Sequence, residues 1–355
     1  MHFMFYTTGN DESYCARENF CSAIAKKIVT LQQKTLVMHP YILLYKTLLP
    51  WKYRRYLALA GGDRDKCHET LLHGTFYEEY DLYGFAGKGE AGRREYLTDA
   101  VRDKLCRRVN SRAGERTVAN KWKTYQRLKP HYHRQIVRLN DMASLQEAVA
   151  LGEREGRLVA KPANQCGGRG VELLRASTRE EWKKLLESRK GCLVEQCIRQ
   201  DEATARWNAD SVNTIRINTF RRGGEVKFFT SFIRTGRKGV FVDNGAQGGI
   251  FASIDDASGL IITDGYDEHG NVYLFHPDSG IRYQGEQIPR WQELLALTRQ
   301  MALSMDGMTY IGWDMALTPE GWEPVEANRG EFVAQQTTLG RGLRKDFERA
   351  CGFRS

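Results

Sequence analysis

The stretch from Tyr310 to Gly330, YIGWDMALTPEGWEPVEANRG, constrains the fold of this chain more than any other. Residues 310–318 are aromatic and alternate enough to predict a strand, and residues 322–327 predict a returning strand. The segment Pro319-Glu320-Gly321 between them is typical of a turn. The stretch therefore predicts a β-hairpin.

Three oxygen-bearing side chains lie on this hairpin. Asp314 is on the first strand, and Glu326 and Asn328 are on or just after the second. Residues two apart on a strand point to the same face, and pairing can bring Asp314 opposite them. Carboxylate and amide oxygens suit Mg²⁺, so we expect a magnesium site formed by Asp314, Glu326 and Asn328. The alternative is a surface hairpin with scattered acids.

A lysine and a glycine-rich loop precede this hairpin in the sequence. Residues 158–162, LVAKP, predict a short strand that ends near Lys161, and a second strand is expected at Val171–Arg175. Between them lies QCGGRG, residues 165–170. Glycines let backbone N–H groups approach a phosphate closely, and a lysine adds a positive charge. The loop lacks the GK[ST] ending of a Walker loop, and a strand rather than a helix follows it.

Two more expected strands carry single charged residues. Residues 192–196 form an apolar strand pattern that contains Glu195, and SVNTIRINTF, residues 211–220, places Arg216 in a strand with polar neighbours. A guanidinium group matches the oxygens of a phosphate or acyl phosphate. Arg234, in the next strand pattern, is the second candidate for this role and has a surface position as its alternative.

The order of these segments resembles the ATP-grasp superfamily, and most closely the sugar-transfer-associated ATP-grasp proteins. The matching pieces are AKPANQCGGRGV, SVNTIRINTF, VDNGAQGGIFASID and IGWDMALTPEGWEPVEANRG, within the stretch from Asn120 to Glu331. The resemblance implies an α+β ATP-grasp fold, with two α+β lobes clamping ATP and a mostly helical N-terminal region before them. The implied domains are 1–115 (helical and basic), 116–205 (N-lobe with the glycine-rich loop) and 206–355 (C-lobe with the metal site).

The resemblance also implies roles for individual residues. Lys161 and Lys121 would hold the ATP phosphates, with Lys123 as the alternative to Lys121. Arg216 and Lys161 would act on the transferred phosphoryl group. A ribose contact would come from Gln200, Asp201 or Glu202, which the sequence does not separate. The residues expected around ATP are Lys121, Lys161, Gly167, Gly168, Arg169, Gly170, Glu195, Gln196, Ile198 and Glu202.

The implied cofactors are ATP and Mg²⁺, and the implied activity is that of an ATP-dependent ligase. Such an enzyme activates a carboxylate as an acyl phosphate and joins it to an amine or another nucleophile. The branch implies a sugar-linked substrate in cell-surface polysaccharide biosynthesis. The alternatives are an ATP-grasp kinase that phosphorylates a hydroxyl and a non-catalytic nucleotide-binding module.

Composition limits the remaining functional classes. The chain has 355 residues and a formal charge of +9, which favours anionic partners. No nucleic-acid-binding motif is present, so we expect no nucleic-acid partner. The sequence has no run of about 18 apolar residues, and its start lacks the pattern of a secretory signal. We therefore expect a cytoplasmic protein, with peripheral attachment at the inner membrane face as an additional possibility.

That attachment would use residues 36–56, which mix Leu, Ile, Trp and Tyr with Lys and Arg, and where Pro40 and Pro50 interrupt the helical pattern. The other interpretation is that Leu43, Leu44, Leu48 and Leu49 pack against the rest of the protein. An earlier amphipathic helix is expected at 16–33.

Three further expectations concern the body of the chain. Residues 93–109 predict one helix, and residues 289–305 predict another whose apolar stripe (Trp291, Leu294, Leu295, Leu297 and Met301) belongs to the core. His269 and His276 are expected to be exposed.

Overall fold

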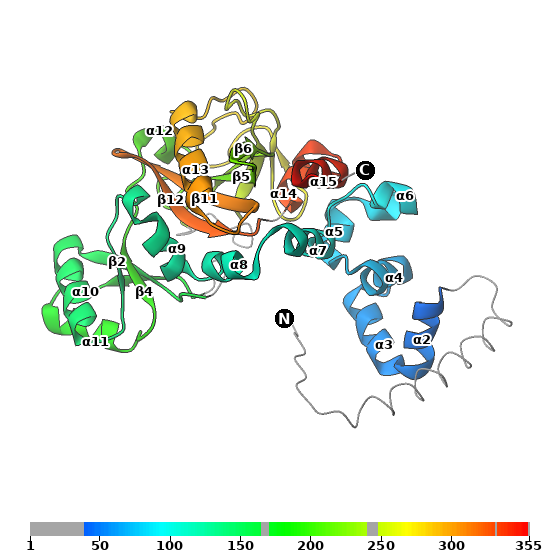
Figure 1. The fold of residues 1–355 in the computed structure, drawn as a ribbon, viewed down its shortest axis with the longest axis horizontal. Coiled ribbons are helices and arrows are strands. Elements are labelled where there is room, and N and C mark those ends of the chain that lie inside the picture. Colours follow the sequence, from blue (N-terminus) through cyan, green and yellow to red (C-terminus); the bar gives the residue numbers. More distant parts are fainter. Residues whose placement is uncertain (1–38, 165–169, 240–247, 331, 354–355) are drawn as a thin grey trace. The chain divides into compact units, whose positions relative to one another are not determined.

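The computed structural model describes residues 39–164, 170–239, 248–330 and 332–353 (Figure 1). Contacts divide the chain into two compact units, residues 1–80 and 81–355. The helix expected at 16–33 lies outside the described residues, as does most of each glycine-rich loop.

The described part of the first unit consists of short helices. They are α2 (Pro40–Leu48), α3 (Pro50–Leu59) and α4 (Arg64–His73), followed by the start of α5 (Tyr77–Leu82). A proline occupies the first position of α2 and of α3, where its missing N–H costs no hydrogen bond, so the expected interruptions at Pro40 and Pro50 are confirmed. A small core between the helices contains Ile42, Tyr53 and Cys67.

Helices also open the second unit. They are η1 (Phe85–Gly87), α6 (Glu90–Arg93), α7 (Asp99–Val109), α8 (Arg112–Val118), α9 (Lys121–Leu128) and η2 (Lys129–His131). The expectation of one helix over 93–109 is wrong, because the chain leaves the helical conformation between α6 and α7. In that gap Leu97 donates its N–H to Gln336 Oε1 over 2.7 Å and accepts from Gln336 Nε2 over 3.1 Å. The side chain of Gln336, 239 positions away, thus replaces the hydrogen bonds that a continuous helix would make at Leu97.

The N-lobe runs from α9 to β4 and contains a four-stranded antiparallel sheet in the order β1-β4-β2-β3. Its strands and helices are β1 (Ile136–Arg138), α10 (Met142–Glu155), β2 (Arg157–Lys161), β3 (Glu172–Arg175), α11 (Arg179–Glu187) and β4 (Leu193–Gln196). Asp141 and Thr178 each form a capping box at the start of α10 and α11.

Both N-lobe helices pack on one face of this sheet. Leu158, Ala160 and Val194 point toward Trp182 and the other core residues of α10 and α11. A Cβ atom at Gly152 would lie 2.5 Å from the Trp182 ring, so the close approach of the two helices requires glycine there. Because strand residues alternate, Lys161 and Glu195 point to the opposite face of the sheet.

The C-lobe, from β5 to α15, is built on an eight-stranded sheet in the order β10-β9-β8-β7-β5-β11-β12, with β6 also paired to β5. Its strands are β5 (Thr214–Arg222), β6 (Glu225–Phe228), β7 (Phe232–Thr235), β8 (Ile250–Ser253), β9 (Gly265–Tyr266), β10 (Val272–Tyr273), β11 (Tyr310–Thr318) and β12 (Gly321–Asn328). The helices are α13 (Trp291–Ser304), α14 (Val333–Leu339) and α15 (Arg344–Cys351), and α12 (Glu202–Ala205) precedes β5.

The predicted hairpin is β11 and β12, and its first strand is fully buried between β5 and the edge strand β12. The predicted apolar stripe of α13 is confirmed as core, because Trp291, Leu294 and Met301 are buried against residues such as Ile217 and Trp313. Two α+β lobes after a helical N-terminal region confirm the expected fold class.

Candidate functional site

A narrow cavity lies where α9, the open face of the N-lobe sheet and β12 meet. Four of the residues expected around ATP and metal line it, namely Lys121, Lys161, Glu195 and Glu326. Aromatic and aliphatic side chains complete its wall, among them Tyr125, Tyr132, Ile136, Val325 and Ala327. The structure thus brings together residues that are as much as 205 positions apart in the sequence.

Lys161 ends β2 and points away from the N-lobe helices. Its Nζ lies 2.6 Å from Oε1 of Glu195 on the neighbouring strand β4, and both side chains are buried. Burial lowers the pKa of Lys161, while Glu195 opposes that shift. For Glu195, burial raises the pKa, but Lys161 and Arg134 more than offset it and hold the carboxyl below its usual range. The pair is therefore a buried ion pair rather than two neutral groups.

Arg134 is a buried residue beside the candidate site that sequence reasoning missed. Its Nε lies 3.0 Å from Glu195 Oε2, its Nη1 lies 2.9 Å from Glu323 Oε2, and the same Nη1 donates to the Pro324 carbonyl over 2.9 Å. Glu195 belongs to the N-lobe and Glu323 to β12, so one guanidinium group joins the two lobes. No local pattern could reveal this, because the two acids are 61 and 189 residues from Arg134 along the chain.

Lys121 occupies the first position of α9. The helix starts there because the Asn120 side chain accepts a hydrogen bond from Lys123 N over 3.0 Å, and Lys121 N donates to the Ala163 carbonyl just after β2. The Lys121 Nζ then lies 2.8 Å from Glu326 Oε1. Lys123, the alternative, is exposed on the helix surface.

Asp314 is buried on β11 of the C-lobe sheet and pairs in register with Arg216 on β5 and Glu326 on β12. Arg216 holds it with two bonds, Nε to Oδ1 over 2.5 Å and Nη2 to Oδ2 over 3.0 Å, and Arg234 Nη2 also forms an ion pair with Oδ1. Burial raises the pKa of the Asp314 carboxyl, but the two arginines outweigh burial and lower it to about 2. The carboxylate is therefore charged throughout the physiological pH range.

Asn328 completes the face that carries Asp314 and Glu326. Its Nδ2 donates to Asp314 Oδ2 over 3.3 Å, and its Oδ1 accepts from Gly330 N over 2.6 Å. Gly330 has φ of 66°, and a Cβ atom there would lie 2.0 Å from the Tyr310 hydroxyl. Only glycine allows the chain to turn at this point, and the turn fixes the orientation of the Asn328 amide.

The donor set at this face fits a hard divalent cation. Asp314 and Glu326 offer two carboxylates from two paired strands, a ligand type that Mg²⁺ prefers. The Asn328 oxygen accepts from Gly330 N, so the amide would have to turn to join them as a ligand. In the structure each carboxylate already contacts a positively charged side chain, Arg216 and Arg234 at Asp314 and Lys121 at Glu326. The two arginines lower the pKa of Asp314 and so keep this carboxylate ionised, as a metal ligand must be.

The remaining residues expected around ATP lie in different settings. Gln196 is engaged away from the cavity, where its Oε1 accepts from Gln135 N over 2.6 Å and its Nε2 donates to Glu155 Oε1 over 2.7 Å. Ile198 is half-buried after β4, and Glu202 is exposed at the start of α12.

The other two residues considered for the ribose contact have local partners. Gln200 binds the backbone of residues 208, 211 and 213, and Asp201 caps α12 through a 2.9 Å bond from Ala203 N. Among the described residues, the Glu202 side chain forms no hydrogen bond or salt bridge, and its role stays a prediction.

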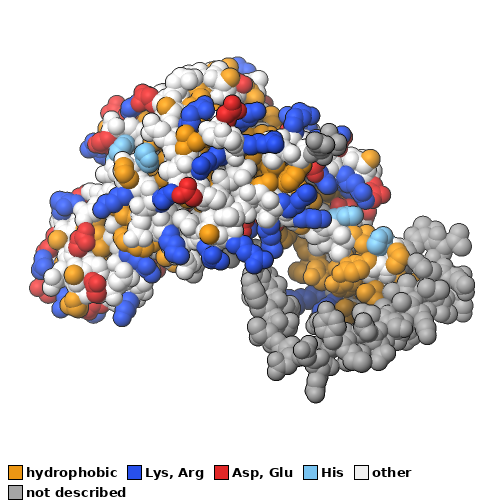
Figure 2. All heavy atoms as spheres, in the orientation of Figure 1, with side chains coloured by type: hydrophobic (Ala, Val, Ile, Leu, Met, Phe, Trp, Pro, Cys, Tyr) orange, Lys and Arg blue, Asp and Glu red, His pale blue; other side chains and the backbone are white. Residues whose placement is uncertain are grey.

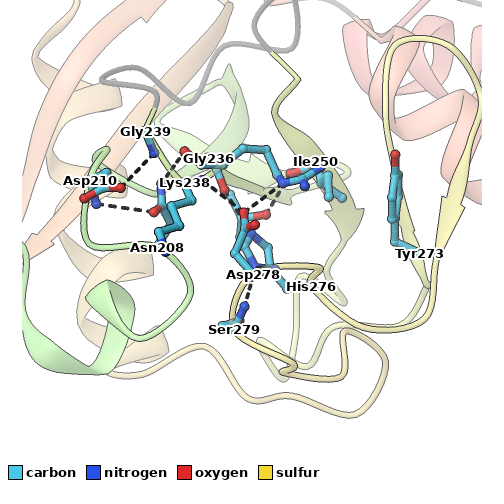
Figure 3. Close-up of polar contacts among 12 residues, drawn as sticks. Asn208, Asp210, Gly236, Lys238, Gly239, Ile250, Tyr273, His276, Asp278 and Ser279 are labelled. Atoms are coloured by element: carbon cyan, nitrogen blue, oxygen red, sulfur yellow. Dashed lines mark hydrogen bonds and ion pairs between the residues drawn. The ribbon is translucent and has the colours of Figure 1, made fainter.

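Gly167, Gly168 and Arg169 of the first glycine-rich loop lie outside the described residues, and Gly170 is the first described residue after them. Residues 240–247 of the second loop also lie outside them. The described segment before that second loop is held by acidic side chains (Figure 3). Gly239 N donates to Asp210 Oδ2 over 2.8 Å, and Lys238 N donates to Asp278 Oδ2 over 3.0 Å.

His276, which was expected to be exposed, is fully buried beside this segment (Figure 3). Its Nδ1 accepts hydrogen bonds from Asp278 N and Ser279 N, so its Nε2 must carry the proton and donate to the Gly236 carbonyl over 2.9 Å. The expectation failed because these partners are all backbone groups, which leave no mark in the sequence. His269 is exposed, as expected.

Two α+β lobes that meet across lysines, acids and arginines define the class of ATP-grasp proteins. Within that class, the chain belongs to the sugar-transfer associated ATP-grasp family, whose model matches residues 100–351. The family assignment made from the sequence is thereby confirmed, and the ATP-grasp superfamily is one of ATP-dependent ligases. No curated protein matches the chain.

Solved structures of ATP-grasp enzymes resemble the chain remotely. D-alanyl-alanine synthetase A from Vibrio cholerae is 14% identical with a TM-score of 0.43, and the match covers 68% of this chain and 67% of that one. The ATP-grasp ligase PsnB, complexed with a precursor variant, Mg and ADP, is 12% identical with a TM-score of 0.43, covering 68% of this chain and 60% of that one. L-amino acid ligase from Bacillus licheniformis is 14% identical with a TM-score of 0.35, and the match covers 60% of this chain and 41% of that one.

Proposed function

We propose that this protein is an ATP- and Mg²⁺-dependent ligase that activates a carboxylate as an acyl phosphate and joins it to an amine or another nucleophile. The observation that carries the proposal is the convergence of two lysines, two arginines and three buried or half-buried acids on facing surfaces of the lobes. Four of these seven side chains are cations, and a nucleoside triphosphate supplies the anionic charge that they would bind.

In this proposal, Lys161 and Lys121 bind the phosphates of ATP. Each lysine is now paired with one carboxylate, at Glu195 and Glu326. The pairing holds both ammonium groups in place at the cavity before ATP arrives. Lys161 is fixed on a strand and Lys121 at a helix start, so little reorganisation is needed to bind phosphate.

Asp314, Glu326 and Asn328 would hold Mg²⁺. When bound, the ion would neutralise charge on the β- and γ-phosphates. Arg216 and Arg234 lie beside the same carboxylate, where their guanidinium groups would hold oxygens of the transferred phosphoryl group. Catalysis of this kind consists of positioning and charge stabilisation rather than covalent participation of a side chain.

The proposed reaction has two steps. A carboxylate oxygen of the substrate attacks the γ-phosphorus, the bond to the bridging oxygen of ADP breaks, and an acyl phosphate forms. An amine then attacks the acyl carbon, loses a proton and displaces inorganic phosphate, which leaves an amide. Lys121, Lys161, Arg216 and Arg234 bind the phosphate oxygens through both steps.

We further propose that the substrate carries a sugar, in the biosynthesis of cell-surface polysaccharides. The family description supports this link to sugar transfer. The net charge of +9 is compatible with an anionic substrate such as a uronic acid. Figure 2 shows Lys and Arg side chains spread over the visible face of the second unit.

The test measures phosphate release from Mg-ATP with a panel of sugar acids and amino acids, each with and without amines. A ligase releases inorganic phosphate only when both a carboxylate and a nucleophile are present, and the amide appears in equal amount by mass spectrometry. Hydroxylamine, which traps acyl phosphates as hydroxamates, serves as a general nucleophile. A phosphorylated hydroxyl product without phosphate release would identify a kinase instead.

A further inference from the structure

The helix α3 of the first unit exposes large apolar side chains on the face that points away from its own core. Trp51 is 61% exposed and Leu59 is 60% exposed, whereas Tyr53 on the other side of the helix is 8% exposed. On α2, Tyr41 and Leu48 are also exposed. Surface residues of this size are unusual when they recur along one helix.

The spacing along α3 places these residues on one surface. Five exposed residues follow one another in steps of three or four positions, which places them on one side of a helix. They are Trp51, Arg54, Arg55, Ala58 and Leu59. We call these five residues the outer face of α3. Apolar side chains stand at both ends of this face and two arginines lie between them. Within the described residues, no salt bridge involves Arg54 or Arg55.

The charge of the surrounding sequence has a single sign. From Asn19 to Gly62 the chain contains no Asp or Glu. All its charged residues there are basic, namely Lys26, Lys27, Lys34, Lys46, Lys52, Arg54 and Arg55. A long basic segment without acids is attracted to an extended anionic surface and is repelled by a basic surface.

We propose that the outer face of α3 binds the surface of an anionic lipid bilayer. Trp51 and Leu59 would enter the boundary between headgroups and acyl chains, where an indole ring and an aliphatic side chain are both favoured. Arg54 and Arg55 would contact the lipid phosphates. Among the described helices, none is long and apolar enough to cross a membrane. The inference concerns where the protein binds and does not depend on the proposed ligase activity.

The charge test uses co-sedimentation of the full chain with vesicles of phosphatidylcholine containing phosphatidylglycerol, at low and high salt. We expect binding at low salt that weakens at high salt and is absent on pure phosphatidylcholine. Arg54→Glu with Arg55→Glu should weaken the partition coefficient at least about 25-fold, from about fivefold for each basic group lost. Lys183→Glu with Lys184→Glu makes the same charge change on two exposed residues of α11 and should leave binding within about twofold.

The apolar test changes Trp51→Ser with Leu59→Ser and should also weaken binding at least about tenfold. Met142→Ser with Leu303→Ser removes two exposed apolar side chains of the second unit and should leave it unchanged. Equal losses in both charge variants, or no vesicle binding at low salt, would overturn the proposal. So would unfolding of the Trp51/Leu59 variant by circular dichroism, or its conversion from an oligomer to a monomer, since the face would then cover another part of the chain or a second copy.

Phosphate release without vesicles distinguishes this inference from the ligase proposal. Neither α3 variant should change it, because no cavity residue is altered. An enzyme that binds vesicles but releases no phosphate with any substrate would contradict the ligase proposal alone.

Discussion

Lys121 Nζ and Glu326 Oε1 lie 2.8 Å apart, although the two residues are separated by 205 positions. The lysine begins an N-lobe helix and the glutamate lies on the C-lobe hairpin. This contact places a candidate phosphate ligand next to a candidate metal ligand, where both would meet the same triphosphate. The predictions below test the site around it.

Replacement of Lys161 should abolish ATP turnover. We expect Lys161→Ala to lower kcat/KM about 100- to 1,000-fold, because a preorganised positive charge is lost from a buried position. Turnover is measured as phosphate release, and the melting temperature reports whether the fold survives. Lys184→Ala, at an exposed position in the same lobe, is the control. Wild-type turnover by a folded Lys161→Ala protein would remove Lys161 from the site.

The two lysines of α9 should differ sharply. Lys121→Ala should weaken ATP binding at least about tenfold, because its ammonium group points into the cavity, whereas Lys123→Ala should leave it unchanged. Isothermal titration with a non-hydrolysable ATP analogue measures both. The reverse ranking would assign the phosphate contact to Lys123.

Removal of the metal should stop turnover, and the hairpin acids should account for the requirement. We expect EDTA to abolish phosphate release and Mg²⁺ to restore it. Asp314→Asn and Glu326→Gln should each weaken Mn²⁺ binding, followed by electron paramagnetic resonance, about 10- to 100-fold in the presence of the nucleotide analogue. Glu320→Gln, at the exposed turn of the same hairpin, should bind Mn²⁺ like the wild type. Unchanged Mn²⁺ affinity in both acid variants would place the metal elsewhere.

Arg134 should be essential for stability as well as for the site. Arg134→Met leaves Glu195 and Glu323 buried without their shared cation, so we expect a loss of about 3–5 kcal/mol in the free energy of unfolding. Arg154→Ala removes an exposed arginine that pairs with Glu155 and should cost less than about 1 kcal/mol. Urea unfolding at pH 7.5 measures both. A cost for Arg134→Met no greater than that for Arg154→Ala would mean that the inter-lobe bridge does not form.

His276 should make stability depend on pH. Burial lowers its pKa in the folded state, so below the unfolded value of about 6.5 the unfolded chain binds the proton more readily. The stabilisation is complete above about pH 6.5 and is lost as the pH falls below it. Urea unfolding from pH 7.5 to 5.5 should therefore show a smaller pH dependence for His276→Gln than for wild type, while His269→Gln, at an exposed position, keeps the wild-type slope. Equal slopes for all three proteins would contradict the buried, neutral histidine.

Local patterns in the sequence account for much of the fold. The hairpin at 310–328, the strand that ends at Lys161, the capped helices α10 and α11, and the apolar stripe of α13 all follow from periodicity, turn residues and caps. Such signals lie within a few residues of each other. The expected helix over 93–109 failed because Leu97 takes its hydrogen bonds from Gln336, which no local window contains.

For the candidate site too, part of the arrangement follows from the sequence and part from the tertiary structure. The sequence by itself determined which residue types could bind phosphate and metal, because Lys161, Asp314, Glu326 and Asn328 stand in recognisable strands with the required spacing. Only the tertiary structure decided how these groups are paired, since Arg134, Arg216 and Arg234 acquire their partners through contacts with residues distant in the sequence. A charge is visible in the sequence, but its pKa and its orientation depend on burial and on neighbours that folding brings together.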